Sequence, residues 1–319
     1  MQAYNRAMSK EQSNNKRILV IGGTGQVAWA LGQGCPQDYT LRMVPRQELD
    51  LSDVDVLASR VEQLIQSFNP QFIVNAAAYT AVDRAESEEN IAFAVNGIAP
   101  AIITNIAAQA NCPVLHYSTD YVFDGTKSGS YVEDDEPNPV SAYGISKLAG
   151  ERGMRAASQQ ILILRTSWVF GVHGSNFLKT MLRLASERDE LSVVSDQFGA
   201  PTSADLIARV SYELMGAMLD VQVDADDPRW GLYHLTASGE TSWHGYAAYL
   251  IARAREMGFP VRVEQEKIKP VTSEQFPTAA VRPANSRLDT QLLRSTFGLT
   301  LPDWTVCVDE VLGKLRCES

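Results

Sequence analysis

The segment Arg17-Ile18-Leu19-Val20-Ile21-Gly22-Gly23-Thr24-Gly25-Gln26-Val27-Ala28 passes from an apolar run rich in β-branched residues into a cluster of glycines. This order predicts a strand, a tight turn and a helix. Glycines at such a turn let the backbone approach a pyrophosphate, and the helix N-terminus supplies N–H donors and a positive dipole end. A plain tight turn is the alternative interpretation. The residues predicted to hold a dinucleotide here are Gly22, Thr24, Gly25, Gln26 and Val27.

The alternation of apolar runs and helical spacing continues along the chain to about residue 170. Apolar runs at 41–44, 72–75, 114–118 and 161–165 predict strands, and residues 54–68, 87–109 and 143–155 predict helices between them. The helix at 87–109 is expected in two pieces, divided near Gly97 and Pro100. Strands that alternate with helices imply a parallel sheet covered on both faces. We therefore predict an α/β fold with a Rossmann-like, doubly wound parallel sheet.

The length of 319 residues is enough for about two domains. Residues 1–15 are polar and predict a disordered tail, not a signal peptide. We expect residues 16–170 to form a nucleotide-binding Rossmann domain. Residues 171–319 are expected to form mainly a smaller substrate-binding lobe, with some segments returning to the first domain. In this second part, residues 176–187, 203–219 and 241–257 predict helices, and residues 231–235 predict a strand.

The composition limits which partners the protein can bind and in which cellular compartment it is expected. The chain carries 28 basic and 38 acidic residues, a net charge of −10, and no basic stripe runs along it, so we expect no nucleic-acid partner. No apolar run reaches the length of about 18 residues that a membrane span needs. The four cysteines form no Cys-x-x-Cys pair and have no histidine cluster beside them, which indicates reduced thiols and no metal site. The resulting expectation is a cytoplasmic protein.

Tyr143 and Lys147 lie four residues apart in a predicted helix, so their side chains share one face. An ammonium beside a phenol stabilises the phenolate and lowers the tyrosine pKa. Such a tyrosine can pass a proton to or from a substrate oxygen. A solvated helical pair is the alternative. This alternative is disfavoured because the other candidate residues follow successive predicted strands, in the order expected for a ligand site at the carboxyl ends of those strands.

Small or polar residues follow two further strands, at the edge where ligands of open α/β sheets bind. The strand at 72–75 leads into the cofactor-contact candidates Ala76, Ala77, Ala78 and Thr80, for which tight packing is the alternative. At the end of the strand at 114–118, Tyr117 is a further cofactor-contact candidate. Thr119 can hold a carbonyl oxygen beside Tyr143. Asp120 can bind substrate hydroxyls, or can serve only to form a turn.

Arg46 follows the second predicted strand, where an acidic residue would bond the 2′-hydroxyl of NAD. An arginine accommodates a 2′-phosphate instead, so NADPH is the preferred cofactor and NADH the second choice. A solvated surface arginine is the alternative. Asp50 can reach the adenine amino group or cap the next helix, and Leu51 follows it at the same site.

Seven segments together resemble the dTDP-4-dehydrorhamnose reductases, a family of extended short-chain dehydrogenases/reductases. They are residues 22–27, 74–83, 116–123, 143–151, 164–169, 196–202 and 282–288. The resemblance runs from about Lys16 into the C-terminal region. It implies transfer of a hydride from a reduced nicotinamide to the C4 ketone of dTDP-4-dehydro-β-L-rhamnose, the last step of dTDP-L-rhamnose biosynthesis. The implied partner is therefore a dTDP-sugar.

The resemblance also implies roles for individual residues. Tyr143 would donate the proton to the nascent alkoxide, Lys147 would hold the nicotinamide ribose, and Thr119 would orient the carbonyl. The implied sugar-nucleotide contacts are Asp120, Tyr143, Trp168, Asn176, Gln197, Pro201 and Thr202, and for Trp168 a core position is the alternative. Arg282 and Asn285 could position the nucleotide or be structural. Ala30 stands where some relatives carry Glu, so metal-assisted assembly is not expected, and a homodimer is left open.

Two other function classes remain as alternatives. A nucleotide-sugar epimerase would share the fold, the glycine turn and the tyrosine–lysine pair, but segments 196–202 and 282–288 favour the reductase. A non-catalytic nucleotide-binding regulatory subunit typically lacks the tyrosine or the lysine, and this chain has both.

Overall fold

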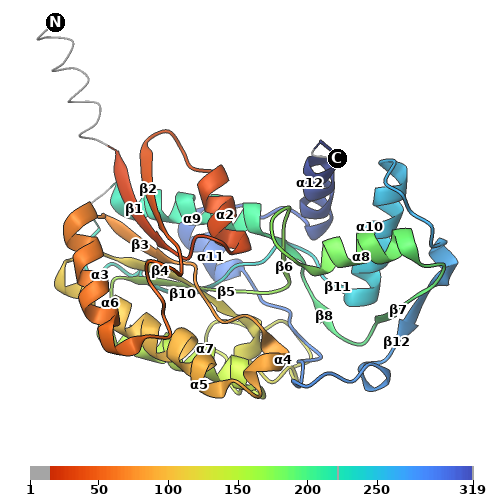
Figure 1. The fold of residues 1–319 in the computed structure, drawn as a ribbon, viewed down its shortest axis with the longest axis horizontal. Helices are drawn as coiled ribbons and strands as arrows, with labels where there is room; N and C mark the ends of the chain where they lie inside the picture. The colour runs from red at the N-terminus through yellow and green to blue at the C-terminus, as the bar shows by residue number, and fades with distance from the viewer. Residues whose placement is uncertain (1–14, 221–222, 318–319) are drawn as a thin grey trace, which may run out of the picture.

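Six parallel strands form the central sheet, in the order β10-β5-β4-β3-β1-β2 (Figure 1). The structure, a computed structural model, describes residues 15–220 and 223–317, so the tail predicted for residues 1–15 lies outside the described residues except for Asn15. The strands of the sheet are β1 (Lys16–Ile21), β2 (Tyr39–Val44), β3 (Phe72–Asn75), β4 (Val114–Thr119), β5 (Ile161–Thr166) and β10 (Gly231–His234). The predicted Rossmann-like parallel sheet is confirmed.

Alternate residues of the strands enter two different cores. Leu19 and Ile73 belong to one core, and Ile18 and Val74 belong to the other. Because successive side chains of a strand point to opposite faces, a parallel sheet that is apolar on both faces needs helices on each. The first core is closed by α3 (Val54–Phe68), α6 (Ala99–Gln109) and α7 (Ala142–Ala157). The second core is closed by α2 (Gln26–Gln33) and α9 (Ala204–Leu219).

The direction in which the chain adds strands reverses between β1 and β3. From β1 the chain moves outward to β2, and it then returns to place β3 on the other side of β1. The backbone N–H of Ala76 donates to the carbonyl of Ile21 at 2.9 Å, so the turns that follow β1 and β3 lie side by side. Ligands of open α/β sheets bind in the crevice at such a reversal.

A smaller set of elements lies beside the sheet, on the right of Figure 1. It includes α8 (Phe177–Glu187) and α10 (Trp243–Glu256). Three short strand pairs accompany them: β6 (Val169–Phe170) with β9 (Thr202–Ser203), β7 (Leu191–Val194) with β12 (Ile268–Val271), and β8 (Phe198–Gly199) with β11 (Thr241–Ser242). The boundary at residue 170 stays a prediction; α9 and β10 come from the later part of the chain and join the central sheet or its helical cover.

The remaining helices are short, or lie near the C-terminus. They are α4 (Val82–Ala85), α5 (Glu89–Phe93), the π-helix η1 (Ala94–Ile98), α11 (Gln291–Phe297), α12 (Trp304–Cys317), and the 3₁₀ turns η2 (Asp120–Val122), η3 (Gln265–Lys267) and η4 (Ser273–Gln275). α11 and α12 are not among the helices that the sequence predicts. Their apolar faces close the second core through residues such as Leu293 and Val308.

Residues 89–109 form one continuous helical stretch, so the predicted break near Gly97 and Pro100 is wrong. α5 passes into η1, and η1 passes into α6. Pro100 has no N–H to donate, and the helix widens to π geometry just before it instead of ending. α7 packs closely against this stretch at Gly150, where an added Cβ would overlap the carbonyl oxygen of Asn96, so only glycine fits there.

The stretch Glu89–Gln109 is also the one helix among the described residues that is long and apolar enough to cross a membrane by length and composition. In this fold α6 instead packs against α3 and α7. Its apolar side chains Ile103 and Ala107 enter the core on that face of the sheet. Burial in the core accounts for these apolar residues, whereas Ile91 and Ile98 of the same stretch are exposed.

Candidate active site

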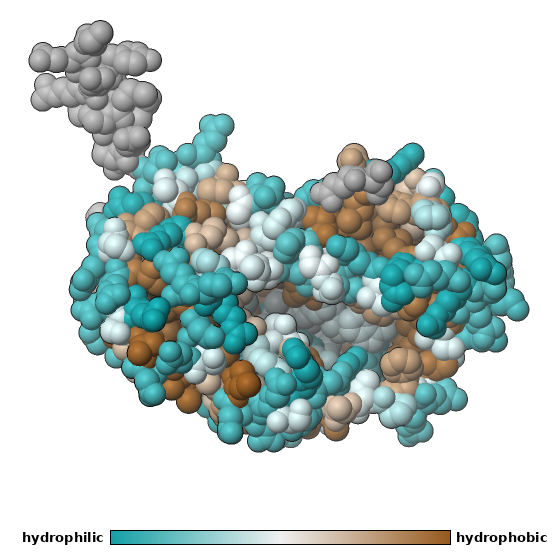
Figure 2. Space-filling model, viewed as in Figure 1, coloured by the Kyte–Doolittle hydropathy of each residue, from teal (hydrophilic) through white to brown (hydrophobic). Residues whose placement is uncertain are grey.

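A cleft of about 740 Å³ lies at the carboxyl ends of the central strands. Figure 2 shows the molecule hollowed between the half that carries the sheet and the half that carries α8 and α10. The lining includes residues 22–27, 49–51, 76–80, 117–121 and 166–169, with Arg46, Tyr143, Lys147 and Trp243. Every residue that the sequence analysis proposed as a cofactor contact lines this cleft.

The glycine turn is open to the cleft at the N-terminus of α2. Gly22 has φ +99°, and a Cβ there would lie 2.9 Å from the backbone nitrogen of Ala77, so only glycine fits between the two turns. Gly25 precedes α2, no side chain caps this helix end, and its first turn carries no acidic residue. The N–H groups and the positive dipole end are therefore available to a pyrophosphate. These features fit a dinucleotide.

Arg46 lies at the rim of the cleft beside Asp50. Its Nε donates to Asp50 Oδ2 at 3.1 Å, and 72% of its side chain is exposed. The hydroxyl of Ser52, then its N–H and Arg46, hold the pKa of Asp50 below its usual value despite slight burial. Asp50 thus orders the turn before α3 and pairs with Arg46, which is an exposed cation at the rim.

Tyr143 and Lys147 come from α7, and Thr119 comes from the end of β4. Tyr143 packs edge-on against Tyr121, with 5.6 Å between the ring centroids. Burial raises the pKa of Tyr143 to about 12, and the neighbouring Thr119 hydroxyl only partly offsets this. The phenol and the Thr119 hydroxyl therefore meet at one place in the cleft, with the phenol protonated at neutral pH.

Lys147 is buried, and its ammonium is directed toward β4. Nζ donates to the carbonyl of Tyr117 at 2.6 Å and lies 3.0 Å from His116 Nε2. Burial lowers the pKa of Lys147 to about 8, and Glu151 partly offsets this. The expected lowering of the Tyr143 pKa by Lys147 is therefore wrong for this structure, because desolvation outweighs a cation whose contacts are with β4.

Asp120 is a buried carboxylate with one free oxygen. Its Oδ1 accepts a hydrogen bond from the Thr119 hydroxyl at 3.0 Å, whereas Oδ2 has no partner among the described residues. Burial raises the pKa of this carboxyl to about 6. An unpartnered carboxylate oxygen is costly to bury, and in a cleft it is suited to accept hydrogen bonds from a ligand's hydroxyls.

Trp168 and Trp243 form a flat aromatic wall of the cleft. Their rings stack with 3.6 Å between centroids and 13° between planes. Trp168 has φ +49°, an uncommon conformation for a bulky residue, and a Cβ on Gly199 would lie 2.8 Å from its ring. Trp243 was not predicted to line the cleft, because nothing in the local sequence around α10 distinguishes it from a core aromatic residue.

Comparison with known proteins adds the family. The sequence model of the protein family described as 'RmlD substrate binding domain' matches residues 16–317 of this chain. The dTDP-4-dehydrorhamnose reductase of Escherichia coli K12 is 42% identical over 93% of this chain and 97% of its own length. That of Burkholderia thailandensis is 42% identical over 93% of this chain and its whole length.

The chain belongs to the dTDP-4-dehydrorhamnose reductase family.

Solved structures agree with this family. The dTDP-4-dehydrorhamnose reductase of Bacillus anthracis, in complex with NADP, superimposes with a TM-score of 0.83 at 32% identity, and the match covers 96% of this chain and 100% of that one. A UDP-glucose 4-epimerase of Thermotoga maritima superimposes with a TM-score of 0.74 at 15% identity. The epimerase likeness shows the fold alone. The resemblance that the sequence motifs indicated is thus confirmed at the level of the family.

Four residues proposed as sugar-nucleotide contacts of this reductase lie outside the cleft lining. Asn176 caps α8 and donates from Nδ2 to Gln26 Oε1 at 2.9 Å, which links α8 to the glycine turn. Thr202 is fully buried, and its hydroxyl donates to the carbonyl of Ala200 at 3.0 Å. Gln197 and Pro201 are buried as well. Their contact with a reductase substrate stays a prediction.

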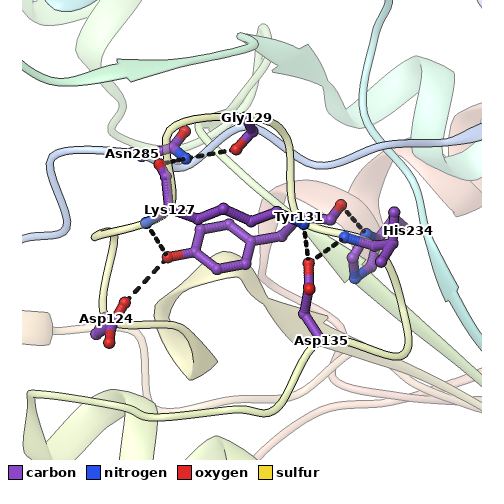
Figure 3. A network of polar contacts seen from close by, with 8 residues as sticks. Asp124, Lys127, Gly129, Tyr131, Asp135, His234 and Asn285 are labelled. Atoms are coloured by element: carbon purple, nitrogen blue, oxygen red, sulfur yellow. Dashed lines mark hydrogen bonds and ion pairs between the residues drawn. The ribbon is translucent and has the colours of Figure 1, made fainter.

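Arg282 and Asn285 are held by protein groups. Arg282 Nη2 pairs with Asp83 at 2.9 Å and so ties the C-terminal segment to α4. Asn285 Nδ2 donates to the backbone carbonyls of Lys127 at 2.7 Å and of Gly129 at 2.8 Å (Figure 3). Asn285 therefore has the structural role that the sequence left open, and it fixes the loop that follows β4.

Proposed function

We propose that this chain reduces the C4 ketone of dTDP-4-dehydro-β-L-rhamnose with NADPH to give dTDP-β-L-rhamnose, the last step of dTDP-L-rhamnose biosynthesis. The observation that carries the proposal is the meeting of Tyr143, Thr119 and the unpartnered oxygen of Asp120 in the cleft that also holds the glycine turn. Family membership supports the substrate.

When bound, NADPH supplies a hydride to the carbonyl carbon. Tyr143 holds the proton that the carbonyl oxygen receives as it becomes a hydroxyl, and its raised pKa keeps that proton in place until transfer. On substrate binding the Thr119 hydroxyl, whose one proton is donated to Asp120 Oδ1 in this structure, would turn that proton to the same oxygen and so orient it. Lys147 binds the nicotinamide ribose, and Asp120 Oδ2 accepts from the sugar hydroxyls. The stacked rings of Trp168 and Trp243 form the aromatic wall of the cleft beside the sugar.

Replacing Arg46 by Ala is expected to raise the KM for NADPH about tenfold and to change the KM for NADH little. The physical reason is that the exposed guanidinium at the cleft rim pairs with a 2′-phosphate that NADH lacks. Initial rates with each cofactor check this. Arg46→Lys, which keeps the charge but not the planar fork, should fall between wild type and Arg46→Ala. An equal change for both cofactors would remove Arg46 from the 2′-phosphate site.

Replacing Asp120 by Asn is expected to raise the KM for the sugar nucleotide about tenfold while the NADPH Kd stays unchanged. In the wild type the same KM should rise as pH falls through about 6, because the carboxylate form that accepts two donors is lost there. The variant has no group that titrates at this position, so its KM should lack that rise. A wild-type KM that is flat between about pH 5 and pH 7 would contradict the role of Asp120.

The direct test of the proposed function is cofactor oxidation by the purified protein with dTDP-4-dehydrorhamnose, NADPH and NADH in parallel. Substrate-dependent oxidation is the expected result. Interconversion of a sugar nucleotide without added reductant would instead indicate an epimerase, and nucleotide binding without any turnover would indicate a regulatory subunit.

We place the reaction in the cytoplasm, in keeping with the four free cysteines. Light scattering of the same sample tests for the homodimer.

A further inference from the structure

His116 is a buried polar residue that the proposed reaction does not use. It lies in the middle of β4, where its register partners are Asn75 on β3 and Ile163 on β5, and it is 1% exposed. Its Nε2 lies 3.0 Å from Lys147 Nζ, whereas Nδ1 has no hydrogen-bond partner of full geometry among the described residues, and the backbone of Asn75 is the other polar group beside the ring. Packing alone would favour a hydrocarbon side chain at this place.

The direction of this contact follows from the chemistry of the two groups. A lysine ammonium has three N–H donors and no acceptor, so His116 Nε2 must carry the lone pair and Nδ1 the proton. Burial, and next the charge of Lys147, lower the pKa of His116 well below its usual value. The ring therefore stays neutral and remains an acceptor for the ammonium.

The second hydrogen-bond acceptor of Lys147, the backbone carbonyl of Tyr117, is held in place as firmly as His116. Nζ donates to the backbone carbonyl of Tyr117 at 2.6 Å, and every residue of β4 is buried between β3 and β5. Glu151, one turn further along α7, is already held by Arg165 from β5 through Nε and Nη2. Thus two neutral atoms of neighbouring residues on a rigid strand hold the ammonium, and one N–H is left.

We propose that His116 is a positioning residue which, with the Tyr117 carbonyl, fixes two N–H groups of Lys147 so that the third faces the cleft and can bond the ribose hydroxyls of the dinucleotide. The inference rests on the cofactor part of the proposed function. Lys147 lines the cleft although its side chain is almost fully buried, as this arrangement requires. Without the histidine acceptor, the buried ammonium would lose its charge more readily and would sample other orientations.

The test compares His116→Phe, which keeps a ring but removes the acceptor, with His116→Gln, which restores an acceptor oxygen. The NADPH Kd is measured by nucleotide fluorescence without any sugar nucleotide, so failure of the proposed reaction does not affect the result. His116→Phe should weaken NADPH binding about tenfold, and His116→Gln should recover most of it. The loss of affinity on raising the pH through about 8, the pKa of Lys147, should begin at lower pH in His116→Phe.

A Lys147→Met background separates positioning from a general structural effect. There His116→Phe should cause no further loss of NADPH affinity, because the group that it positions is absent. Unchanged affinity in His116→Phe, or an equal loss in both backgrounds, would overturn the proposal. If His116→Phe does not fold, as judged by circular dichroism, His116→Asn replaces it, since its shorter amide falls short of Nζ and should weaken binding in the same way.

Discussion

Replacing Tyr143 by Phe is expected to lower kcat by about 10²–10⁴-fold while the NADPH Kd changes little. The change removes one hydroxyl from a phenol that is already packed against Tyr121, so the ring and the cleft keep their shape. The proton that the carbonyl oxygen needs then has to come from water. Because burial raises the pKa of Tyr143 to about 12, the wild-type donor stays protonated through the neutral range, and its ionisation should not limit kcat there.

The matched control is Tyr121→Phe. It removes the same hydroxyl from a neighbouring ring in the same cleft, and it should lower kcat far less than Tyr143→Phe. Single-turnover and steady-state rates with saturating NADPH measure both variants. Equal losses in the two variants would show that the cleft needs its general polarity and not a specific proton donor at Tyr143.

Replacing Glu151 by Leu is expected to lower the free energy of unfolding by about 3–5 kcal/mol. Glu151 accepts from Arg165 Nε at 2.9 Å and from Nη2 at 2.6 Å, and both side chains are at most 3% exposed. Ser118 also donates to Glu151. Removing the carboxylate leaves a guanidinium that is buried and cannot lose its proton, so its desolvation is no longer offset.

The double variant Glu151→Leu/Arg165→Met is the control for this prediction. It removes both charges together and should recover most of the lost stability, because apolar side chains of similar size can replace a buried ion pair. Urea unfolding at constant pH measures all three proteins. A loss below about 1 kcal/mol in Glu151→Leu would mean that water or another group compensates Arg165.

Much of the fold follows from local patterns. The strand–glycine–helix order at residues 17–28 and the repeated apolar runs predict β1, β3, β4 and β5 close to their observed bounds, since a strand buried on both faces must be apolar throughout. The place of β10 in the central sheet could not be predicted, because a run of only four residues, Gly231–His234, carries no information about its neighbour. The close contact between η1 and Gly150 of α7 likewise joins segments that are far apart in the chain.

The candidate site divides in the same way. Residues that follow strands, such as Ala76, Thr119 and Asp120, could be identified because parallel strands bring their carboxyl ends to one edge. Trp243 and His116 could not. Trp243 is brought to the cleft by α10, which lies more than 70 residues further along the chain than Trp168. His116 acts through the side chain of Lys147, which belongs to a different element.

By itself, the sequence determined the α/β class, the dinucleotide turn and the family, and it predicted the Tyr143–Lys147 pair, because each of these is carried by short segments whose residues are neighbours in the chain. The tertiary structure decided the electrostatic state of the site. Whether Tyr143 or Lys147 is charged depends on desolvation and on partners from other strands, and here burial raises one pKa and lowers the other. The desolvation and the charge interactions that shift these pKa values depend on the three-dimensional surroundings of each side chain, which the spacing of residues in the sequence does not predict.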